Sequence, residues 1–486
     1  MFDKSIYSIL RQGLTGREHI RVAVIGAKGS GKTVFLTSLT NHLRNHDPEL
    51  LNLDGWSVVY IENDAGGNDA IPSFQYAKAR EQLGRGEWPD NTRSLSVVRL
   101  KLRLEKKGGR RVAHRTVVLE LLDIPGERVA DLSMFGRSFR EWCEWMEARF
   151  CGVEGNCTHY SEYVGRIEAE NDGAAILSAY KDCVSKQYED GLLTITPSVL
   201  KLGVDGEFRT GENAGDYRAN IASACIGVDD GSQFAPLPRT YLDADSAERR
   251  AVVNAFQKAY GKYRSRIVDP IGKWLSHVNK AVFLVDVLSL LREGPKEYNA
   301  EQNFAEQALK IFRRPCSDSP ILKGVQRLMG AFVRTRADGV YVVATKSDTV
   351  VGEQNRSRMK NLAYAMMKPA LSGLGLPSGQ WDVLSCASVL TAEEYLREKA
   401  LEARVEVGKA ENGKDEKTGK PILVPIVEKK QYSVSDVPME WPDDDAWQRG
   451  GENYDFRPTF PKFDKKSDRP PRQLGLDYLA RLLLSL

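Results

Sequence analysis

Residues 20–33 read IRVAVIGAKGSGKT, an apolar strand-like run that leads into the pattern G-x-x-x-x-G-K-[ST]. The glycines Gly26, Gly29 and Gly31 permit backbone turns that a Cβ would block. Successive backbone N–H groups can then surround a phosphate at the start of the helix predicted after the loop, where the helix dipole also favours anions. The stretch therefore predicts a phosphate-binding P-loop, and with it an α/β fold of the P-loop NTPase class.

Each polar position of this loop has an expected task. Lys32 is expected to reach the β- and γ-phosphate oxygens and to neutralise charge during phosphoryl transfer, and the Thr33 hydroxyl to ligate Mg²⁺. Ser30 and Val34 complete the predicted nucleotide-binding set around the loop. Lys28 is a candidate for an internal positive finger, and a side chain that points to solvent is the alternative.

Length, charge and cysteine content limit the class of protein. The 486 residues suffice for two or three domains, and 69 basic against 66 acidic residues leave a net charge of +3, so no nucleic acid is expected. Cys151, Cys157 and His159 lie close together, but no second cysteine pair completes a zinc pattern. Reduced thiols, no signal peptide and no transmembrane run predict a cytoplasmic protein.

The first 19 residues are assigned as an N-terminal segment with a short amphipathic helix over 3–14. Docking of this helix on the protein's own surface is the favoured interpretation. A peripheral membrane contact is the alternative, although membrane helices usually carry a stronger basic face.

Two strands are predicted upstream of a second motif, after a helix over 71–83. Residues 95–105 alternate apolar and polar side chains, and 112–122 return after turn residues at 107–109. The pair is expected to form an antiparallel hairpin. Such a pair, with the first strand at the sheet edge, is typical of the GTPase branch of P-loop proteins.

The return strand ends in Asp123-Ile124-Pro125-Gly126, a D-x-x-G pattern. Asp123 is expected to hold Mg²⁺ through water, and the Gly126 N–H to sense the γ-phosphate. Thr92, in a polar loop upstream, is the candidate to close over Mg²⁺ and the γ-phosphate, and a plain loop threonine is the alternative. Glu127 stands where small GTPases carry a water-positioning Gln. A carboxylate accepts but does not donate as an amide does, so slow hydrolysis is expected.

Between 128 and 279 the alternation of strands and helices is interrupted. Helices are predicted at 139–146, 160–189, 246–264 and 267–278, with a loop-rich segment at 200–243. We expect 128–279 to be a helical insertion domain that grows out of the second switch. The P-loop core is then expected to comprise 20–127 and 280–398.

The core resumes with a continuous apolar run at 280–287, which suits a strand buried on both faces. Helices are predicted at 300–313 and 320–334. A strand at 339–344 then leads into Thr345-Lys346-Ser347-Asp348, a [NT]-K-x-D pattern. Asp348 can accept from the guanine N1–H and the exocyclic amine together, and the Lys346 stem can cover the base, so the pattern predicts guanine selection. A helix cap at Ser347 or Asp348 is the alternative.

Ser385, Cys386 and Ala387 follow the next predicted strand, and they are similar to the short S-A-type loop whose backbone N–H reads the guanine oxygen. Beyond them, 399–486 is expected to be an irregular C-terminal extension that ends in a helix. Two short strands, at 403–408 and 422–428, flank a polar tip, and 474–486 predict an apolar helix docked on the core.

These motifs resemble those of the YcjX-like family, bacterial P-loop proteins linked to envelope stress. The resemblance spans nearly the whole chain and is carried by the P-loop, by Asp123-Ile124-Pro125-Gly126-Glu127, by the strand at 282–291 and by the ending 469–479, which departs in detail. Its best motifs are shared with all GTPases. It implies a Ras-like GTPase core, with a mixed sheet and one antiparallel edge strand, a large helical insertion, nucleotide-dependent conformational change and a role in stress response.

The residues and the resemblance together predict a protein that binds GTP/GDP with Mg²⁺, hydrolyses GTP slowly and moves its insertion domain with nucleotide state. Lys32, Thr92 and Glu127 are the predicted catalytic residues, and Thr33, Thr92 and Asp123 the predicted metal ligands. An unidentified protein partner is expected to bind through the insertion domain. Two alternatives stay open: an ATPase in which residues 345–348 are incidental, and a nucleotide-binding scaffold with little turnover.

Overall fold

A computed structural model of the chain divides into two compact units, one formed by residues 1–123, 278–298 and 316–486 and the other by 124–277 and 299–315. The second unit takes in residues 299–315, which the sequence places in the core. The structure describes residues 17–27, 29–47, 55–63, 71–90, 95–106, 113–124, 131–151, 158–189, 233–275, 278–310, 339–374, 376, 379–414, 421–443, 445–447, 454–462 and 470–484.

The first unit is built on a seven-stranded sheet with the order β2-β3-β4-β1-β5-β6-β7. The strands are β1 (Arg17–Ile25), β2 (Trp56–Asn63), β3 (Ser96–Lys106), β4 (Ala113–Asp123), β5 (Lys280–Val285), β6 (Gly339–Ala344) and β7 (Trp381–Ser385). All neighbouring pairs from β4 to β7 are parallel, whereas β3 is antiparallel to both β4 and β2. Most of the sheet is therefore parallel, with the P-loop strand β1 near its centre.

The predicted antiparallel hairpin is confirmed as β3 and β4, but the prediction that its first strand lies at the edge of the sheet is wrong. The strand β2, which the sequence analysis did not predict, pairs with β3 from Trp56↔Lys106 to Asn63↔Leu100 and takes the edge position. The outer strand is held by a bond from Lys101 Nζ to the Glu62 carboxylate. Its side chains Val59 and Tyr60 are exposed, which is why its pattern lacks a clear buried face.

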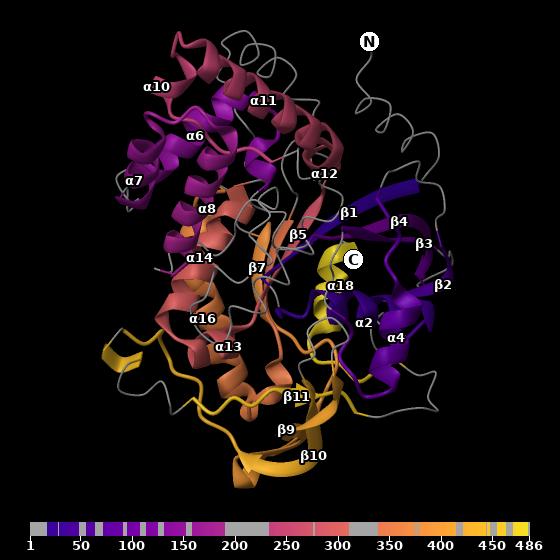
Figure 1. Cartoon of the computed structure of the whole chain (residues 1–486). Helices are drawn as coiled ribbons and strands as arrows, with labels where there is room; N and C mark the ends of the chain where they lie inside the picture. Colours follow the sequence, from indigo (N-terminus) through magenta and orange to yellow (C-terminus); the bar gives the residue numbers. More distant parts are fainter. Residues whose placement is uncertain are drawn as a thin grey trace. The chain divides into compact units, whose positions relative to one another are not determined.

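Helices cover both faces of this sheet. On one face α2 (Lys32–Arg44) and α18 (Leu476–Leu484) bury one apolar side of each helix in a common core with alternate residues of the strands. Figure 1 shows α16 (Gly352–Ser372) and α13 (Val287–Glu293) on the opposite side of the sheet from α2 and α18. The strands β5 and β6 are buried along their whole length, as a sheet covered on both faces requires.

The chain leaves the core sheet after β7 and builds a second sheet before it returns. The strands β8 (Ala392–Tyr395), β9 (Ala400–Lys414), β10 (Pro421–Ser433) and β11 (Thr459–Phe460) form it, with β9 paired to all three others. The two predicted short strands are confirmed as the longer hairpin β9–β10. The segment expected to be irregular is therefore partly a sheet, and the predicted terminal helix is confirmed as α18.

The second unit is helical in the part that the structure describes. It contains α6 (Phe139–Cys151), α7 (Thr158–Ile167), α8 (Gly173–Glu189), α10 (Arg239–Leu242), α11 (Ala247–Tyr263), the π-helical turn η3 (Arg264–Val268) and α12 (Asp269–Leu275). Its core is aromatic, with Phe234 and Tyr260 ring centroids 5.3 Å apart. The predicted helix over 160–189 is interrupted at Asp172, whose carboxylate caps α8 by accepting from the backbone N–H groups of Ala174 and Ala175.

The remaining elements are short or lie at the edges of these units. They are α4 (Tyr76–Gly84), α14 (Pro295–Lys310), η1 (Leu132–Met134), η4 (Ser347–Thr349) and η5 (Leu396–Glu398). The helix predicted over 71–83 begins five residues later than expected, and those predicted over 3–14 and 320–334 lie outside the described residues. Among the helices that the structure describes, none combines the length and apolarity needed to cross a bilayer.

Candidate nucleotide-binding site

Those predicted site residues that the structure describes lie at one edge of the core sheet. The strands β4, β1, β5, β6 and β7 are adjacent and parallel, so their carboxyl ends meet at the same edge. Asp123 ends β4, the P-loop follows β1, Asp286 follows β5, Thr345 follows β6 and Ser385 ends β7. The edge outside the carboxyl ends of parallel strands is where α/β sheets bind ligands.

The P-loop has the backbone that its glycines were expected to permit. Gly29 and Gly31 adopt φ angles of +80° and +92°, in the left-handed region that other residues avoid, and Gly31 is the N-cap of α2. A Cβ on Gly26 would come within 2.4 Å of Ser30 Oγ and within 2.6 Å of the Leu284 carbonyl oxygen. The loop is therefore packed tightly against the end of β5, and its shape suits a phosphate group at the N-terminus of α2.

The side chains of this loop bond to its own backbone. Lys32 Nζ donates to the carbonyl oxygens of Gly26, at 2.6 Å, and Ala27, at 2.9 Å. Ser30 Oγ donates to the Ala27 carbonyl at 2.8 Å. The ammonium group thus lies over the loop itself, at the place where a phosphate would accept from it.

Two of the predicted metal ligands fit Mg²⁺ by their chemistry and position. Thr33 lies in the first turn of α2, and Asp123 is fully buried at the end of β4, in register with Val24 of β1. Hydroxyl and carboxylate oxygens are the hard ligands that Mg²⁺ prefers, and this ion usually takes only one or two protein ligands and completes its shell with phosphates and water. In the described part of the chain no cluster of three or more His, Cys, Asp or Glu residues forms a closed metal site.

Four predicted site residues fall outside the described residues: Lys28, Thr92, Gly126 and Glu127. Their assigned roles stay predictions.

The residues after β6 are tied to the end of β5. Thr345 donates from its backbone N, at 2.9 Å, and from Oγ1, at 3.2 Å, to the Val285 carbonyl oxygen. Lys346, with φ +60°, bonds through Nζ to the Asp286 carboxylate, which also accepts from the backbone N of Ser289 at 3.1 Å. Burial alone would raise the pKa of Asp286, but the Lys346 ammonium and the Ser289 donors outweigh it and hold that pKa below its usual value.

Asp348 is buried, and its carboxylate is bonded to the loop that follows β7. Its Oδ2 accepts hydrogen bonds from the backbone N and from Oγ1 of Thr391, at 2.6 and 2.7 Å. Burial nevertheless raises the pKa of Asp348 above the usual range of an aspartate. This carboxylate already accepts two hydrogen bonds from Thr391, so a guanine base would have to share it with Thr391.

The loop after β7 is held in the same way. The backbone N of Cys386 donates to the Ala344 carbonyl at 2.8 Å, and Ala387 and Leu474 exchange two backbone hydrogen bonds at 2.9 Å. Gly475, with φ +75°, lies so close that a Cβ would come within 2.6 Å of the Ser385 carbonyl oxygen. The backbone N–H groups of Cys386 and Ala387 are therefore engaged, and a guanine oxygen would have to be read by a later N–H group, such as that of Ser388.

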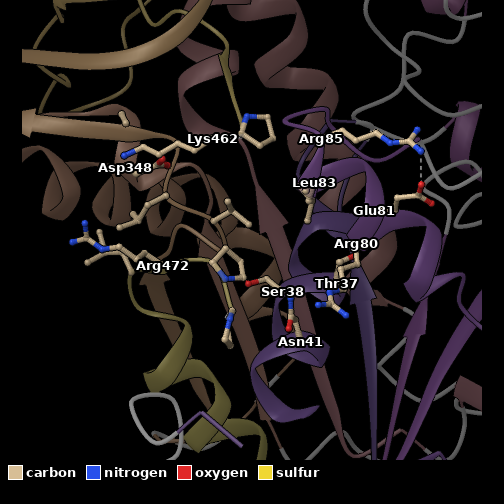
Figure 2. Close-up of a pocket in the computed structure, with 18 of the residues that line it drawn as sticks. Thr37, Ser38, Asn41, Arg80, Glu81, Leu83, Arg85, Asp348, Lys462 and Arg472 are labelled. Carbon is tan, nitrogen blue, oxygen red and sulfur yellow. Dashed lines mark hydrogen bonds and ion pairs between the residues drawn. The ribbon is translucent and has the colours of Figure 1, made fainter. Parts of the chain in front are cut away.

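A large pocket of about 1530 Å³ opens beside Asp348, between α2, α4, β8 and the segments around Pro461 and Arg472. Figure 2 shows Asp348 and Lys462 across the pocket from Thr37 and Arg80. Six basic side chains line it against four acidic ones, namely Arg44, Arg80, Arg85, Arg356, Lys462 and Arg472 against Glu81, Asp348, Glu393 and Glu394. Three of these acids are paired with basic residues of the pocket itself, which are Arg85, Lys462 and Arg356.

Three residues of this site were not predicted from the sequence. Asp286 has the same signal as Asp123, an acidic residue directly after a buried apolar strand, and could have been found by it. Thr391 and Leu474 have no local signal, because their contacts with Asp348 and Ala387 form only when the chain folds back.

Known proteins resemble the chain over almost its whole length. The model of the YcjX-like family, DUF463, matches residues 20–209 and 228–485 of the chain. A relative from Escherichia coli (strain K12), named Ras-like GTPase YcjX, is 25% identical over 486 residues, which covers 95% of this chain and 95% of the relative. A protein of the same name from Shewanella oneidensis is 24% identical over 484 residues, covering 93% and 92%.

Proposed function

Because the chain belongs to the YcjX-like family, we propose that it is a GTP-binding protein that hydrolyses GTP slowly with Mg²⁺. The observation that carries this proposal is the convergence at one sheet edge of the P-loop, Asp123 and the Thr345–Asp348 turn. The relatives named Ras-like GTPase, similar over almost the whole chain, support the same conclusion.

Each residue of the site has its own role in binding or hydrolysis. The P-loop N–H groups bind the β-phosphate, and Lys32 exchanges its bonds to the Gly26 and Ala27 carbonyls for bonds to phosphate oxygens. Thr33 and Asp123 hold Mg²⁺, which when bound neutralises charge on the phosphates. Asp348 and Lys346 bind the base. Glu127 orients water only as an acceptor, which keeps hydrolysis slow.

We propose further that the helical unit responds to the bound nucleotide. The D-x-x-G motif crosses the boundary between the units, since Asp123 ends a segment of the first and Ile124 begins the second. Seven residues beyond Ile124, the buried Asp131 accepts a hydrogen bond from Tyr263 Oη at 2.7 Å, which joins this segment to α11. A displacement at Gly126 would therefore be transmitted along the chain to Asp131 and to α11 of the helical unit.

Phosphate release tests the enzymatic part of the proposal. Lys32→Ala removes the charge at the phosphates, so we expect release from GTP to fall about 10- to 100-fold. Lys360→Ala, at an exposed position of α16, is the matched control and should behave like the wild type. Equal release by wild type and Lys32→Ala would leave a binding protein with no turnover of its own.

Hydrogen exchange tests the switching part. We expect backbone N–H groups of η1 and α6, between residues 132 and 151, to exchange at different rates with GDP and with a non-hydrolysable GTP analogue. Identical exchange rates in both nucleotide states would contradict the proposed switch.

One observation favours a second candidate, an ATP-binding protein. The bonds from Thr391 to Asp348 would suit a carboxylate that only joins two turns, and the Cys386 and Ala387 N–H groups are engaged. In that case Asp348 would have no part in choosing the base.

A further inference from the structure

We propose that the second sheet determines base selectivity, because Thr459 of β11 and Thr391 together hold the Asp348 carboxylate in its base-reading position. The inference rests on the proposed guanine-binding role of Asp348. It assigns Thr391 and Thr459 as positioning residues, which act on the base through Asp348.

The contacts form a buried chain of three side chains. Thr391 Oγ1 lies 2.7 Å from Asp348 Oδ2 and 2.7 Å from Thr459 Oγ1. All three residues are less than 10% exposed, so water does not compete for these bonds. The sequence separates Thr459 from Thr391 by 68 positions, and the second sheet brings them together.

The direction of these bonds follows from the chemistry of the groups. An ionised carboxylate only accepts, so the single hydroxyl hydrogen of Thr391 goes to Asp348. Thr391 Oγ1 is then left as an acceptor, and Thr459 is the donor that satisfies it. A substitution that removes the Thr459 hydroxyl therefore weakens the hold of Thr391 on Asp348 although it touches neither Asp348 nor a nucleotide.

Thr459 itself is fixed by contacts with other parts of the first unit. Its carbonyl oxygen accepts from Trp88 Nε1 at 2.8 Å, and its neighbours in β9 include Val405. Next to it, Arg404 Nη1 donates to the carbonyl oxygens of Gly86, at 3.0 Å, and Pro461, at 2.5 Å. The strand β11 is thus anchored to the segment after α4, and its hydroxyl is presented to Thr391 at a set place.

A second set of contacts fixes the loop that carries Thr391. The backbone N of Leu390 donates to the Arg472 carbonyl at 2.8 Å, and Ala387 is bridged to Leu474. The loop is therefore held at both ends by the segment that returns from the second sheet to α18. Loss of one hydroxyl should change the orientation of Asp348 rather than release the whole loop.

The experiment compares Thr459→Val with Thr459→Ser in the full chain. Dissociation constants for GTP and ATP are measured by displacement of a fluorescent guanine nucleotide at fixed Mg²⁺. We expect Thr459→Val to lower the preference for GTP over ATP about fivefold or more through weaker GTP binding, with ATP binding unchanged. Thr459→Ser keeps the donor and should retain the wild-type preference.

Thr40→Val is the matched control, because Thr40 is buried on α2 and its hydroxyl makes no hydrogen bond to the described residues. Should Thr459→Val not fold, Trp88→Phe removes the donor to the Thr459 carbonyl and should lower the preference in the same direction. A folded Thr459→Val, or Trp88→Phe in its place, with an unchanged preference would overturn the inference. A wild type with no preference would instead overturn the guanine assignment itself.

Discussion

The ammonium group of Lys346 bonds to the carboxylate of Asp286, so the turn after β6 is joined to the end of β5. Lys346 has a left-handed backbone, with φ +60°, which a residue other than glycine keeps only when its surroundings hold it. The pair therefore fixes the lysine stem on the turn that carries Asp348.

We expect Asp286→Asn to lower GTP affinity about 3- to 10-fold. The amide still accepts from the Ser289 backbone but no longer attracts the Lys346 ammonium, so the lysine stem is less well placed to cover the base. Glu18→Gln removes the acid of an ion pair with Arg115 between β1 and β4, at the start of β1 and away from the carboxyl edge of the sheet, and serves as the control. Unchanged GTP affinity in Asp286→Asn, measured by titration calorimetry, would show that the pair has no part in base binding.

Acidification should weaken GTP binding before it weakens the Asp286–Lys346 pair. Burial raises the pKa of Asp348, whereas the Lys346 ammonium and the Ser289 donors lower that of Asp286 in spite of its burial. Protonated Asp348 loses acceptor capacity, so GTP affinity should fall as the pH is lowered from neutral while ATP affinity does not. The nearby Cys386 and Tyr432 do not ionise in this range, because burial raises the pKa of each to about 12.

Titration of these two aspartates does not destabilise the fold over this range. A group whose native pKa is raised adds stability as it takes up a proton, and Asp348 does so on acidification. Asp286 adds stability above its unfolded pKa of about 3.9 and loses it only as the pH falls toward its lowered native value. The pH dependence should disappear in Asp348→Asn, and a dependence that persists there would assign it to another group.

Gly26→Ala should abolish nucleotide binding and destabilise the first unit by about 1–3 kcal/mol. The new Cβ would collide with the Leu284 backbone carbonyl, which cannot turn away as a side chain can. Gly165→Ala, in α7, is the control, since a Cβ there meets nothing within 4 Å and alanine favours a helix. Thermal unfolding measures the stability of both variants. A Gly26→Ala protein as stable as the wild type would show that the loop is packed less tightly than described.

Asp348→Asn should exchange one base preference for another. The asparagine amide presents a donor where the carboxylate accepted from the guanine amine, and xanthine has a carbonyl oxygen at that position. We expect GTP affinity to fall about 100-fold or more, with a gain for xanthosine triphosphate and no change for ATP. A loss that is equal for all three nucleotides would mean that Asp348 supports the fold and not the base.

The sequence predicts those features that depend on a short pattern of consecutive residues. The P-loop, the buried strand at 280–285 and the turn at 345–348 each consist of a few consecutive residues whose order requires a particular backbone. The edge strand β2 was missed because Val59 and Tyr60 face solvent and hide its alternation. The hold on Asp348 could not be predicted, since Thr391 and Thr459 reach it only through the pairing of β9 with β8 and β11.

The most direct test of the proposed function is competition between GTP and ATP for the wild-type protein loaded with a fluorescent guanine nucleotide. A carboxylate at the base site rejects adenine because adenine lacks the paired N–H donors of guanine and leaves the carboxylate unpaired. We predict that GTP displaces the probe at a concentration at least about 100-fold lower than ATP does. Displacement by both nucleotides at the same concentration would contradict the assignment of Asp348 and of this protein as a GTP-binding protein.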